Sequence, residues 1–205
     1  NAENAMGLEI EYLPGQTPID EQEKEGLKIL TISTTGELDE FEQKNIEQAV
    51  QWTIGRRIKA DKLVSEQFIR SLHMRMYGEV WKWAGQFRKT EKNIGVESWR
   101  IPTDLRQLLG DTIYWIENDT FPEDEIAIRF KHGIVSIHCF PNGNGRHSRL
   151  MADLIVEKIF NRKIFTWGQS NSILSKESNS RSIYLKALKK ADKGHFSDLL
   201  KFARS

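Results

Sequence analysis

The chain has little cysteine and no strong excess of either charge. Cys139 is the one cysteine among 205 residues, so no disulfide can form within the chain, which is compatible with a reducing compartment. The 30 basic residues nearly balance the 29 acidic ones and give a net charge of +1. A protein that acts mainly on nucleic acid usually carries a visible basic excess. The charge balance therefore gives no support for nucleic-acid binding.

Long apolar runs are also missing. No stretch approaches the roughly 20 consecutive apolar residues that cross a bilayer, and no basic segment followed by an apolar one marks a secretory signal. We therefore expect no membrane association and a cytoplasmic location. Hydrophobic residues make up 39% of the chain and charged residues 29%, and the length suits a single hydrophobic core.

Most of the chain shows apolar residues at helical spacing. Thr34 and Glu37 have the spacing of a capping box, and the apolar residues that follow predict a helix behind them. The same periodicity predicts further helices over about 61–80, 103–116, 122–137, 179–191 and 195–203, and another apolar stripe runs from Leu150 to Ile159 after the glycine-rich loop.

Two segments break the helical pattern. Residues 1–33 contain turn signals and are predicted to lie as an extended N-terminal arm over the domain. Residues 88–100 show no helical period and are predicted to form a short hairpin or an irregular loop. The predicted fold class is all-α with one small β-hairpin, organised as the arm 1–33 and a single helical domain over 34–205.

The stretch from His138 to Arg149 carries the chemistry. An apolar helix delivers the histidine, a tight glycine-rich loop follows, and a new helix begins. Gly143 and Gly145 permit backbone angles and close approaches that other residues obstruct. The N–H groups of the loop can then converge on an anion at the start of the next helix, where the helix dipole also favours negative charge.

Two arginines and the histidine complete this predicted anion site. Arg146 and Arg149 are three residues apart, so they are neighbours on one helix face and suit a chain of phosphates. Positive charge at a helix N-terminus is unfavourable without an anion, which favours a binding role over plain surface cations. His138 is placed to take a proton from a hydroxyl, and its unperturbed pKa of about 6.5 makes this feasible near neutral pH. A histidine that only packs in the core is the alternative, which the motif context disfavours.

The stretch resembles the signature of the Fic family, usually written H-P-F-x-(D/E)-G-N-G-R-x-x-R, with its spacing undisturbed. The resemblance extends over roughly residues 35–203 and includes Trp83–Arg88 and Arg181 with Tyr184. The sequence up to Leu38 further looks like the subgroup called mobile mystery protein B. The matching residues of the signature are His138, Phe140, Gly143, Asn144, Gly145, Arg146 and Arg149.

The resemblance implies a Fic-type helical domain and a protein adenylyltransferase of bacterial origin. Such an enzyme moves the AMP part of ATP to a Tyr, Thr or Ser hydroxyl of a target protein. His138 would be the base, and Phe140 would anchor the loop in the core. Tyr184 would border the adenine. The segment 88–100 would be a flap that aligns the main chain of the target protein by strand addition.

The resemblance also implies how the triphosphate is held. Gly143, Asn144 and Gly145 would hold the α- and β-phosphates. Arg146 would lie on the β-phosphate side and Arg149 near the γ-phosphate.

Two positions depart from the family signature. Cys139 replaces its proline, and Asn142 replaces the Asp or Glu that holds magnesium in the family. An amide oxygen is a weaker, neutral ligand for Mg²⁺. We therefore expect Mg²⁺ to be bound mainly through the ATP phosphates, with Asn142 assisting. The other histidines lack cysteine or carboxylate partners at ligand spacing, so no structural metal is predicted.

Glu42 is the candidate inhibitory residue. Many Fic proteins carry a glutamate helix, (S/T)-x-x-x-E-(G/N), whose Glu pairs with the second motif arginine. The nearest piece of this chain is Leu38–Gln43, which departs at both ends. The hypothesis is that Glu42 pairs with Arg149 in the resting enzyme. A separate inhibitor protein is the alternative, because an acidic residue near a helix start needs no special role.

Three functions stay open. The first is the AMP-transferase, and the second is a nucleotide-binding regulatory protein with little or no turnover, motivated by Asn142. The third transfers another phosphate-containing group, such as UMP or phosphocholine. The target protein, its modified residue and the oligomeric state, with a homodimer as one option, correspond to no motif of the sequence. Fold analogy alone is a weak guide to substrate.

Overall fold

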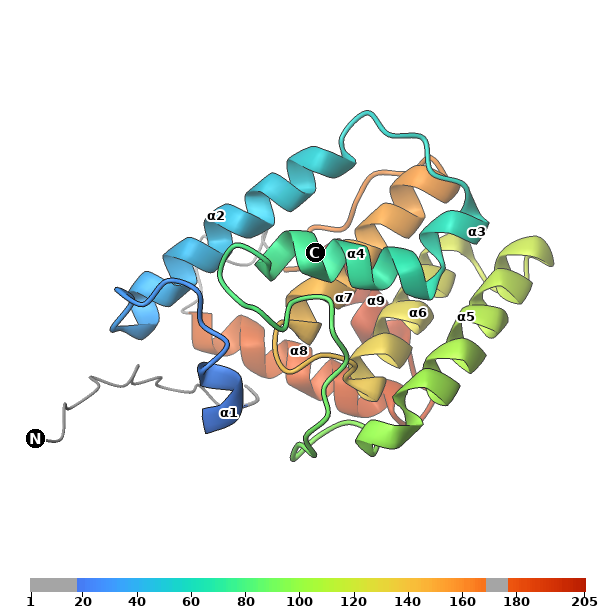
Figure 1. The fold of residues 1–205 in the computed structure, drawn as a ribbon. Coiled ribbons are helices and arrows are strands. Elements are labelled where there is room, and N and C mark those ends of the chain that lie inside the picture. Colours follow the sequence, from blue (N-terminus) through green and yellow to red (C-terminus); the bar gives the residue numbers. More distant parts are fainter. Residues whose placement is uncertain (1–17, 169–176) are drawn as a thin grey trace, which may run out of the picture.

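The computed structural model describes residues 18–168 and 177–205, and these ranges are predominantly helical (Figure 1). Within them no strand forms, and one isolated antiparallel bridge joins Leu27 to Trp81. A 3₁₀ turn, Ser98–Arg100, precedes α5, and a π-helical turn, Ile155–Ile159, follows α7. The α-helices are α1 Glu21–Lys24, α2 Thr35–Thr53, α3 Ala60–Leu63, α4 Glu66–Tyr77, α5 Ile101–Glu117, α6 Glu123–Ile137, α7 Asn144–Leu154, α8 Glu177–Ala191 and α9 Ser197–Arg204.

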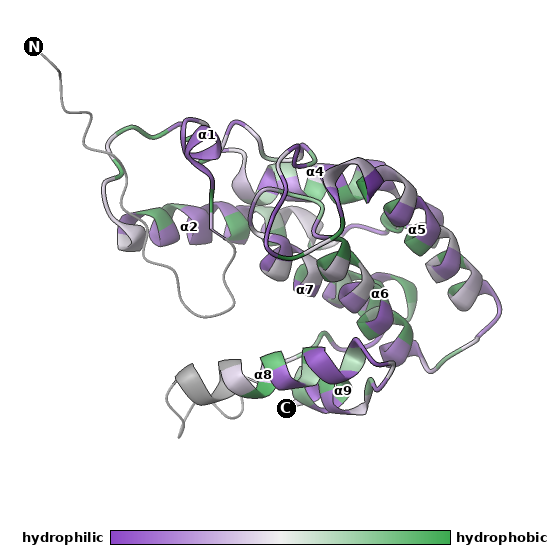
Figure 2. Ribbon diagram, turned by 90° about the horizontal axis from the view of Figure 1, so that it is seen from below, coloured by the Kyte–Doolittle hydropathy of each residue, from purple (hydrophilic) through white to green (hydrophobic). Residues whose placement is uncertain are grey.

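The helices α6 and α7 form the centre of the molecule, and the others pack around them. In Figure 1, α5 lies beside α6 on one side, and α4 lies over α7 with α2 beyond it. The helices α8 and α9 pack against each other, and α9 packs against α6. Figure 2 shows this pair below the other helices. The apolar core draws on residues from Ile19 to Ala203. The predicted all-α fold is confirmed.

The helix α2 begins where the capping box predicts. The Glu37 N–H donates to Thr34 Oγ1 at 3.3 Å, and the Thr34 N–H donates to Glu37 Oε2 at 3.1 Å. Three of its buried residues, Glu42, Asn45 and Thr53, are polar, and each has hydrogen-bond partners. The Asn45 amide joins the Arg75 carbonyl at 2.7 Å and the Glu79 N–H at 2.9 Å. These bonds fix α2 against α4 and thereby place Glu42, one turn earlier on the same face, opposite α7.

The helix predicted over 61–80 is two helices in the structure. The chain leaves helical geometry at Val64, and Ser65 then caps α4 by accepting a hydrogen bond from the Phe68 N–H at 3.2 Å. A serine side chain that satisfies a free N–H is a strong helix start. The break therefore follows from local capping, which the i+4 apolar repeat did not reveal.

The flap, residues 88–100, is an irregular loop rather than a β-hairpin. Its first residue, Arg88, is 3% exposed and donates to the carbonyls of Thr90, Val96 and His138. A ladder between two strands would need the Thr90 and Val96 carbonyls for main-chain pairing. The Arg88 side chain bonds them instead, and it ties the flap to the end of α6.

The described part of the predicted arm, residues 18–33, includes the short helix α1 and pairs with the segment before the flap. The Lys28 N–H donates to the Val80 carbonyl and the Lys82 N–H to the Gly26 carbonyl, both at 2.8 Å. Residues 1–17 lie outside the described residues. In the described ranges, no helix has the length and apolarity needed to span a bilayer.

Candidate functional site

The turn from α6 to α7 presents the predicted motif. His138 ends α6 in the left-handed conformation with φ of 58°, and Gly143 precedes α7 with φ of 78°. A Cβ on Gly143 would lie 2.5 Å from the Tyr77 ring, so only glycine fits there. A Cβ on Gly145 would meet no atom within 4 Å, so the space beside its Cα is open. An anion that approaches a helix N-terminus needs such space near the first turn.

Asn144 closes the turn through its side chain. Its Oδ1 accepts from the Phe140 N–H at 3.0 Å, and its Nδ2 donates to the Phe140 carbonyl at 2.8 Å. The side chain is 5% exposed. Its amide is thus used inside the turn, and the main-chain N–H is the part of Asn144 suited to the predicted phosphate contact.

Phe140, the predicted anchor of the loop, is fully buried. Its ring stacks on His73 with centroids 3.7 Å apart and meets the His147 ring edge-on at 5.3 Å. These rings form the floor under the turn and hold it against α4.

Two buried histidines support the turn, and the sequence reasoning missed both. His73 Nδ1 accepts from the Gly85 N–H at 3.0 Å, so Nε2 carries the proton and donates to the Asn142 carbonyl at 3.0 Å. His147 Nε2 bonds to the Ile69 carbonyl at 3.0 Å. His147 is 1% exposed, so it faces the core and not solvent. The position of His73 within the apolar stripe of α4 was the available signal.

His138 lies under the flap. The residue is 4% exposed, and neither ring nitrogen has a hydrogen-bond partner in the described part of the chain. Burial, and then the charges of Arg88 and Lys92, lower the pKa of His138 to about 4 against the opposing effect of the Val135 main chain. The imidazole is therefore neutral at neutral pH and has a lone pair available to accept a proton.

Glu42 pairs with Arg146, whereas the hypothesis paired it with Arg149. One carboxylate oxygen bonds to the Arg146 guanidinium, and the other accepts from Trp81 Nε1 at 2.7 Å. Glu42 is 3% exposed, whereas the Arg146 side chain is 36% exposed, so the carboxylate is buried and the guanidinium is partly open to water. The first motif arginine is thus already bound to a carboxylate.

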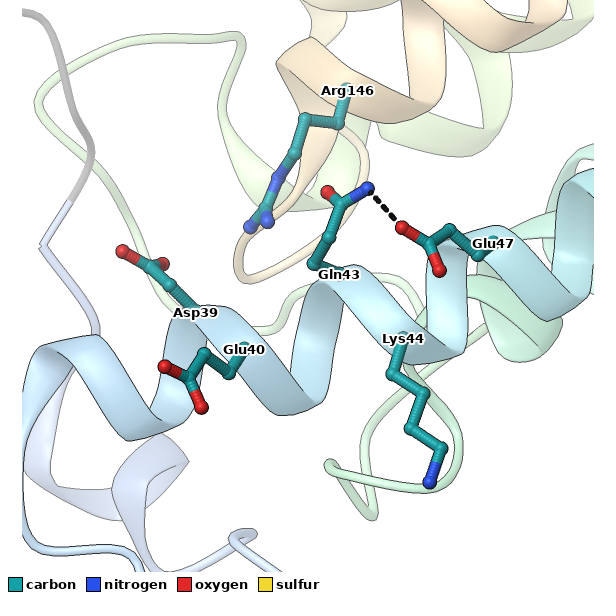
Figure 3. A pocket seen from close by; sticks show the side chains of 6 residues that line it. All are labelled: Asp39, Glu40, Gln43, Lys44, Glu47 and Arg146. Carbon is teal, nitrogen blue, oxygen red and sulfur yellow. Dashed lines mark hydrogen bonds between the residues drawn. The ribbon is translucent and has the colours of Figure 1, made fainter.

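The guanidinium of Arg146 also borders an open hollow of about 520 Å³ on the outer face of α2. Figure 3 shows Arg146 reaching from α7 toward α2, with Asp39 and Glu40 on one side and Gln43 and Glu47 on the other. The acidic residues Asp39, Glu40 and Glu47 and the basic residues Lys44 and Arg146 line the hollow, so its charges nearly balance.

Arg149 and Tyr184 lie together on the other side of the turn. The Arg149 guanidinium lies 5.7 Å from the centroid of the Tyr184 ring, and Arg149 Nε contacts the Gly145 carbonyl at 3.4 Å. The fully buried Lys131 donates to the Tyr184 hydroxyl. Burial, and then the charge of Arg149, hold the pKa of Lys131 well below its usual value. Lys131 is a further residue that sequence reasoning missed. Arg181 lies in the part of α8 whose side chains are not described.

Asn142 turns its side chain into the loop. Its Oδ1 accepts from the Gly143 N–H, while its carbonyl faces His73. The described residues contain no group of three His, Cys, Asp or Glu side chains that could hold a metal ion. A magnesium ion here would have one neutral protein oxygen within the loop, so phosphate and water oxygens must supply most of its ligands.

Comparison with known proteins agrees with this architecture. The model of the Fic/DOC family matches residues 63–156, from the end of α3 to the turn after α7. The chain is similar to the BepC protein of Bartonella tribocorum with bound AMPPNP, with a TM-score of 0.67, 14% identity and coverage of 90% of this chain and 97% of that one. The N-terminal Fic domain of a putative cell filamentation protein from Bartonella quintana, with bound ADP, gives a TM-score of 0.63, 15% identity and coverage of 85% and 86%.

A third similar structure is residues 134–508 of Fic-1 from C. elegans. It gives a TM-score of 0.61 and 19% identity, and the match covers 78% of this chain and 46% of that one. This chain therefore spans less than half of that relative. At such identities the structural likeness establishes the fold, and the similarity to the mobile mystery protein B subgroup stays a prediction.

Acidification is expected to destabilise the fold through the buried histidines. Burial lowers the pKa of His138 and His147 to about 4 and that of His73 well below 6.5. As pH falls below about 6.5, the unfolded chain binds protons at these sites that the folded chain does not, so stability is lost. Asp153 opposes this trend, because burial raises its pKa to about 6 and the folded state then binds the extra proton.

Near pH 5 the unfolded chain binds about three more protons at the three histidines, and the folded chain binds about one more at Asp153. The unfolded chain therefore binds about two more protons in total. We therefore expect the free energy of unfolding to fall by roughly 2–3 kcal/mol per pH unit near pH 5. Urea unfolding over this pH range measures the slope. The variant His147→Gln should reduce the slope by about half, while replacement of the exposed His195 by Gln should leave it unchanged. A stability that rises on acidification would contradict the assignment.

Proposed function

Because the chain contains a Fic domain, we propose that it is a protein adenylyltransferase, which moves AMP from ATP to a Tyr, Thr or Ser hydroxyl of another protein. The observation that carries the proposal is a neutral His138 whose ring nitrogens have no partner in the described residues, next to an open helix start with two arginines. Two similar Fic structures hold AMPPNP and ADP, which supports a nucleotide as the ligand.

The proposed reaction is a displacement at the α-phosphorus. A nitrogen of His138 takes the hydroxyl proton of the target, and the hydroxyl oxygen attacks the phosphorus. The bond to the bridging oxygen of the β-phosphate breaks, and pyrophosphate leaves with the bonding electron pair. The N–H groups at the start of α7, with Arg146 and Arg149, stabilise the negative charge that develops.

Magnesium is proposed as the cofactor and would shield the phosphate charges when bound. Asn142 is the protein residue placed to assist it, and the ATP oxygens supply the charged ligands. The segment 88–100 is proposed to bind the target protein.

Glu42 is proposed as the inhibitory residue of the resting state. Its carboxylate occupies the Arg146 guanidinium, which the β-phosphate would otherwise engage. An anion already paired with the arginine must be displaced before a phosphate can bind. This proposal keeps the inhibitory role predicted for Glu42 and assigns it to the first motif arginine. A separate inhibitor protein remains compatible with the same site.

The second candidate function is a nucleotide-binding regulatory protein with little turnover. The neutral Asn142 and the closed Glu42–Arg146 pair favour it. Transfer of another group, such as UMP or phosphocholine, would use the same base and the same displacement.

Transfer of AMP is tested with ATP labelled at the α-phosphate in a cell lysate. Wild-type protein is expected to label itself or a lysate protein, and His138→Ala should reduce the label by at least about 100-fold, as expected for removal of a general base. His195→Ala, at an exposed position, is the matched control. Label that survives His138→Ala would contradict the role of the base. Nucleotide binding without any label would favour the regulatory function.

Removal of the Glu42 charge is expected to raise AMP transfer. Glu42→Gln keeps an oxygen for the Trp81 N–H but weakens the bond to Arg146, so the initial rate should rise about tenfold, since a bond between charged groups contributes about 1.5–3 kcal/mol. Glu40→Gln, on the exposed face of the same helix, is the control. Equal rates for Glu42→Gln and wild type, with an unchanged melting temperature, would assign inhibition to another group.

Restoring a carboxylate at position 142 is expected to strengthen magnesium binding. The variant Asn142→Asp should lower the Mg²⁺ concentration for half-maximal transfer by about tenfold, because a charged oxygen is a better ligand for Mg²⁺ than an amide. Asn118→Asp, at the end of α5, adds the same charge away from the loop. An unchanged magnesium dependence would remove Asn142 from the metal site.

A further inference from the structure

Lys92 in the flap has a buried ammonium group held by the N-terminal segment 18–24. Its side chain is 3% exposed. The Nζ atom donates to Glu23 Oε2 at 2.5 Å, to Asp20 Oδ2 at 2.9 Å and to the Pro18 carbonyl at 3.2 Å. All three acceptors come from a segment about 70 residues earlier in the chain. The ammonium is therefore fully coordinated by one foreign segment.

Glu23 binds the flap a second time. Its other oxygen, Oε1, accepts from Thr90 Oγ1 at 2.8 Å, and Oε2 also accepts from the Asp20 N–H at the start of α1. The Glu23 carboxylate is thus shared between the capping of α1 and two side chains of the flap. A shift of α1 would break all of these bonds together.

The far end of the flap lies directly on His138. A Cβ on Gly95 would be 2.6 Å from the His138 Cβ, and the Val96 N–H donates to the Ile137 carbonyl at 3.3 Å. The φ of Gly95 is 99°, which side chains of L-residues rarely adopt. His138 is 4% exposed and both of its ring nitrogens are buried, so a hydroxyl group does not reach them while the flap is in place.

Apolar packing holds the flap only weakly. Its largest apolar side chains, Ile94 and Trp99, are 47% and 77% exposed. A segment with few buried apolar contacts opens at low free-energy cost unless polar bonds hold it. A buried ammonium resists separation from its carboxylates, because one partner without the other leaves an uncompensated charge. The position of the flap therefore depends on Arg88 at its base and on the Lys92 cluster.

We propose that Asp20 and Glu23 hold the flap closed over His138 through Lys92, so that release of the segment 18–24 gives the target hydroxyl access to the base. Lys92 is then a positioning residue that acts on His138 through the flap. The proposal rests on the proposed function in so far as His138 is the base. It assigns control of that base to a segment outside the motif and outside residues 63–156.

Chemical access to His138 tests this directly. Diethyl pyrocarbonate acylates neutral imidazole nitrogens, and mass spectrometry of the peptides follows each histidine separately, with exposed His195 as the internal reference. Lys92→Met keeps the aliphatic stem and removes the charge, and it should raise the acylation rate of His138 about tenfold, the scale of one bond to a charged group. Lys92→Arg should stay within about twofold of wild type, because it retains the charge. Lys89→Met, at an exposed position of the flap, should also leave the acylation rate of His138 within about twofold of wild type.

An acylation rate of His138 in Lys92→Met equal to that of wild type would overturn the proposal. A rate raised equally by Lys89→Met would also overturn it, because the effect would then be one of net charge. Circular dichroism and the melting temperature establish that each variant is folded. If Lys92→Met fails to fold, the double variant Asp20→Asn, Glu23→Gln decides by the same criterion. The measurement uses neither ATP nor target, so its outcome is independent of whether AMP transfer is observed.

Discussion

The double hydrogen bond between the Asn144 side chain and the Phe140 main chain is the interaction on which the site depends. It closes the chain between the end of α6 and the start of α7 into a turn of one shape. His138 lies at one end of that turn and the phosphate-facing glycines at the other. The stacked rings of Phe140 and His73 then hold the closed turn on α4. On the proposed function, a base and an anion site on two different helices thus keep a constant separation, which is the positioning that displacement at phosphorus requires.

The cations of the site are balanced or weakened by groups of the protein itself. Arg146 is neutralised by a buried carboxylate, whereas Lys131, beside Arg149, has a pKa held far below its usual value. Both the pairing of Arg146 and the lowered pKa of Lys131 reduce the electrostatic repulsion between positive side chains near the N-terminus of α7. A triphosphate would reverse both, by displacing Glu42 and by favouring the charged form of Lys131. On the proposed function, the site therefore responds electrostatically to its nucleotide.

The sequence predicted the helices well, because their apolar stripes and caps are local signals. Thr34 and Glu37 placed the start of α2, and the motif spacing alone brought His138, Gly143 and Arg146 into one turn. The partner of Glu42 could not be predicted in the same way. Arg146 and Arg149 are adjacent on one helix face, and the choice between them depends on the register of α2 against α7, which the Asn45 bonds to α4 determine. The prediction of a hairpin was wrong for a similar reason. The side chain of Arg88, which belongs to no local sequence pattern, bonds the carbonyls that a pair of strands would use.

The two closed features of the site lie on opposite sides of the turn and share no residue. Glu42, which belongs to α2, pairs with Arg146. The Lys92 cluster, which includes the N-terminal segment 18–24, holds the flap over His138. Contacts that share no partner contribute nearly additively to free energy. If each closure contributes a bond to a charged group, about 1.5–3 kcal/mol, the state with both open is roughly 10²-fold or more rarer than the state with both closed. On the proposed function, a nucleotide opens the first closure, because its β-phosphate competes with Glu42 for the Arg146 guanidinium. The second must be opened by something that contacts the flap or the segment 18–24, and on the proposed function that partner is the target protein itself.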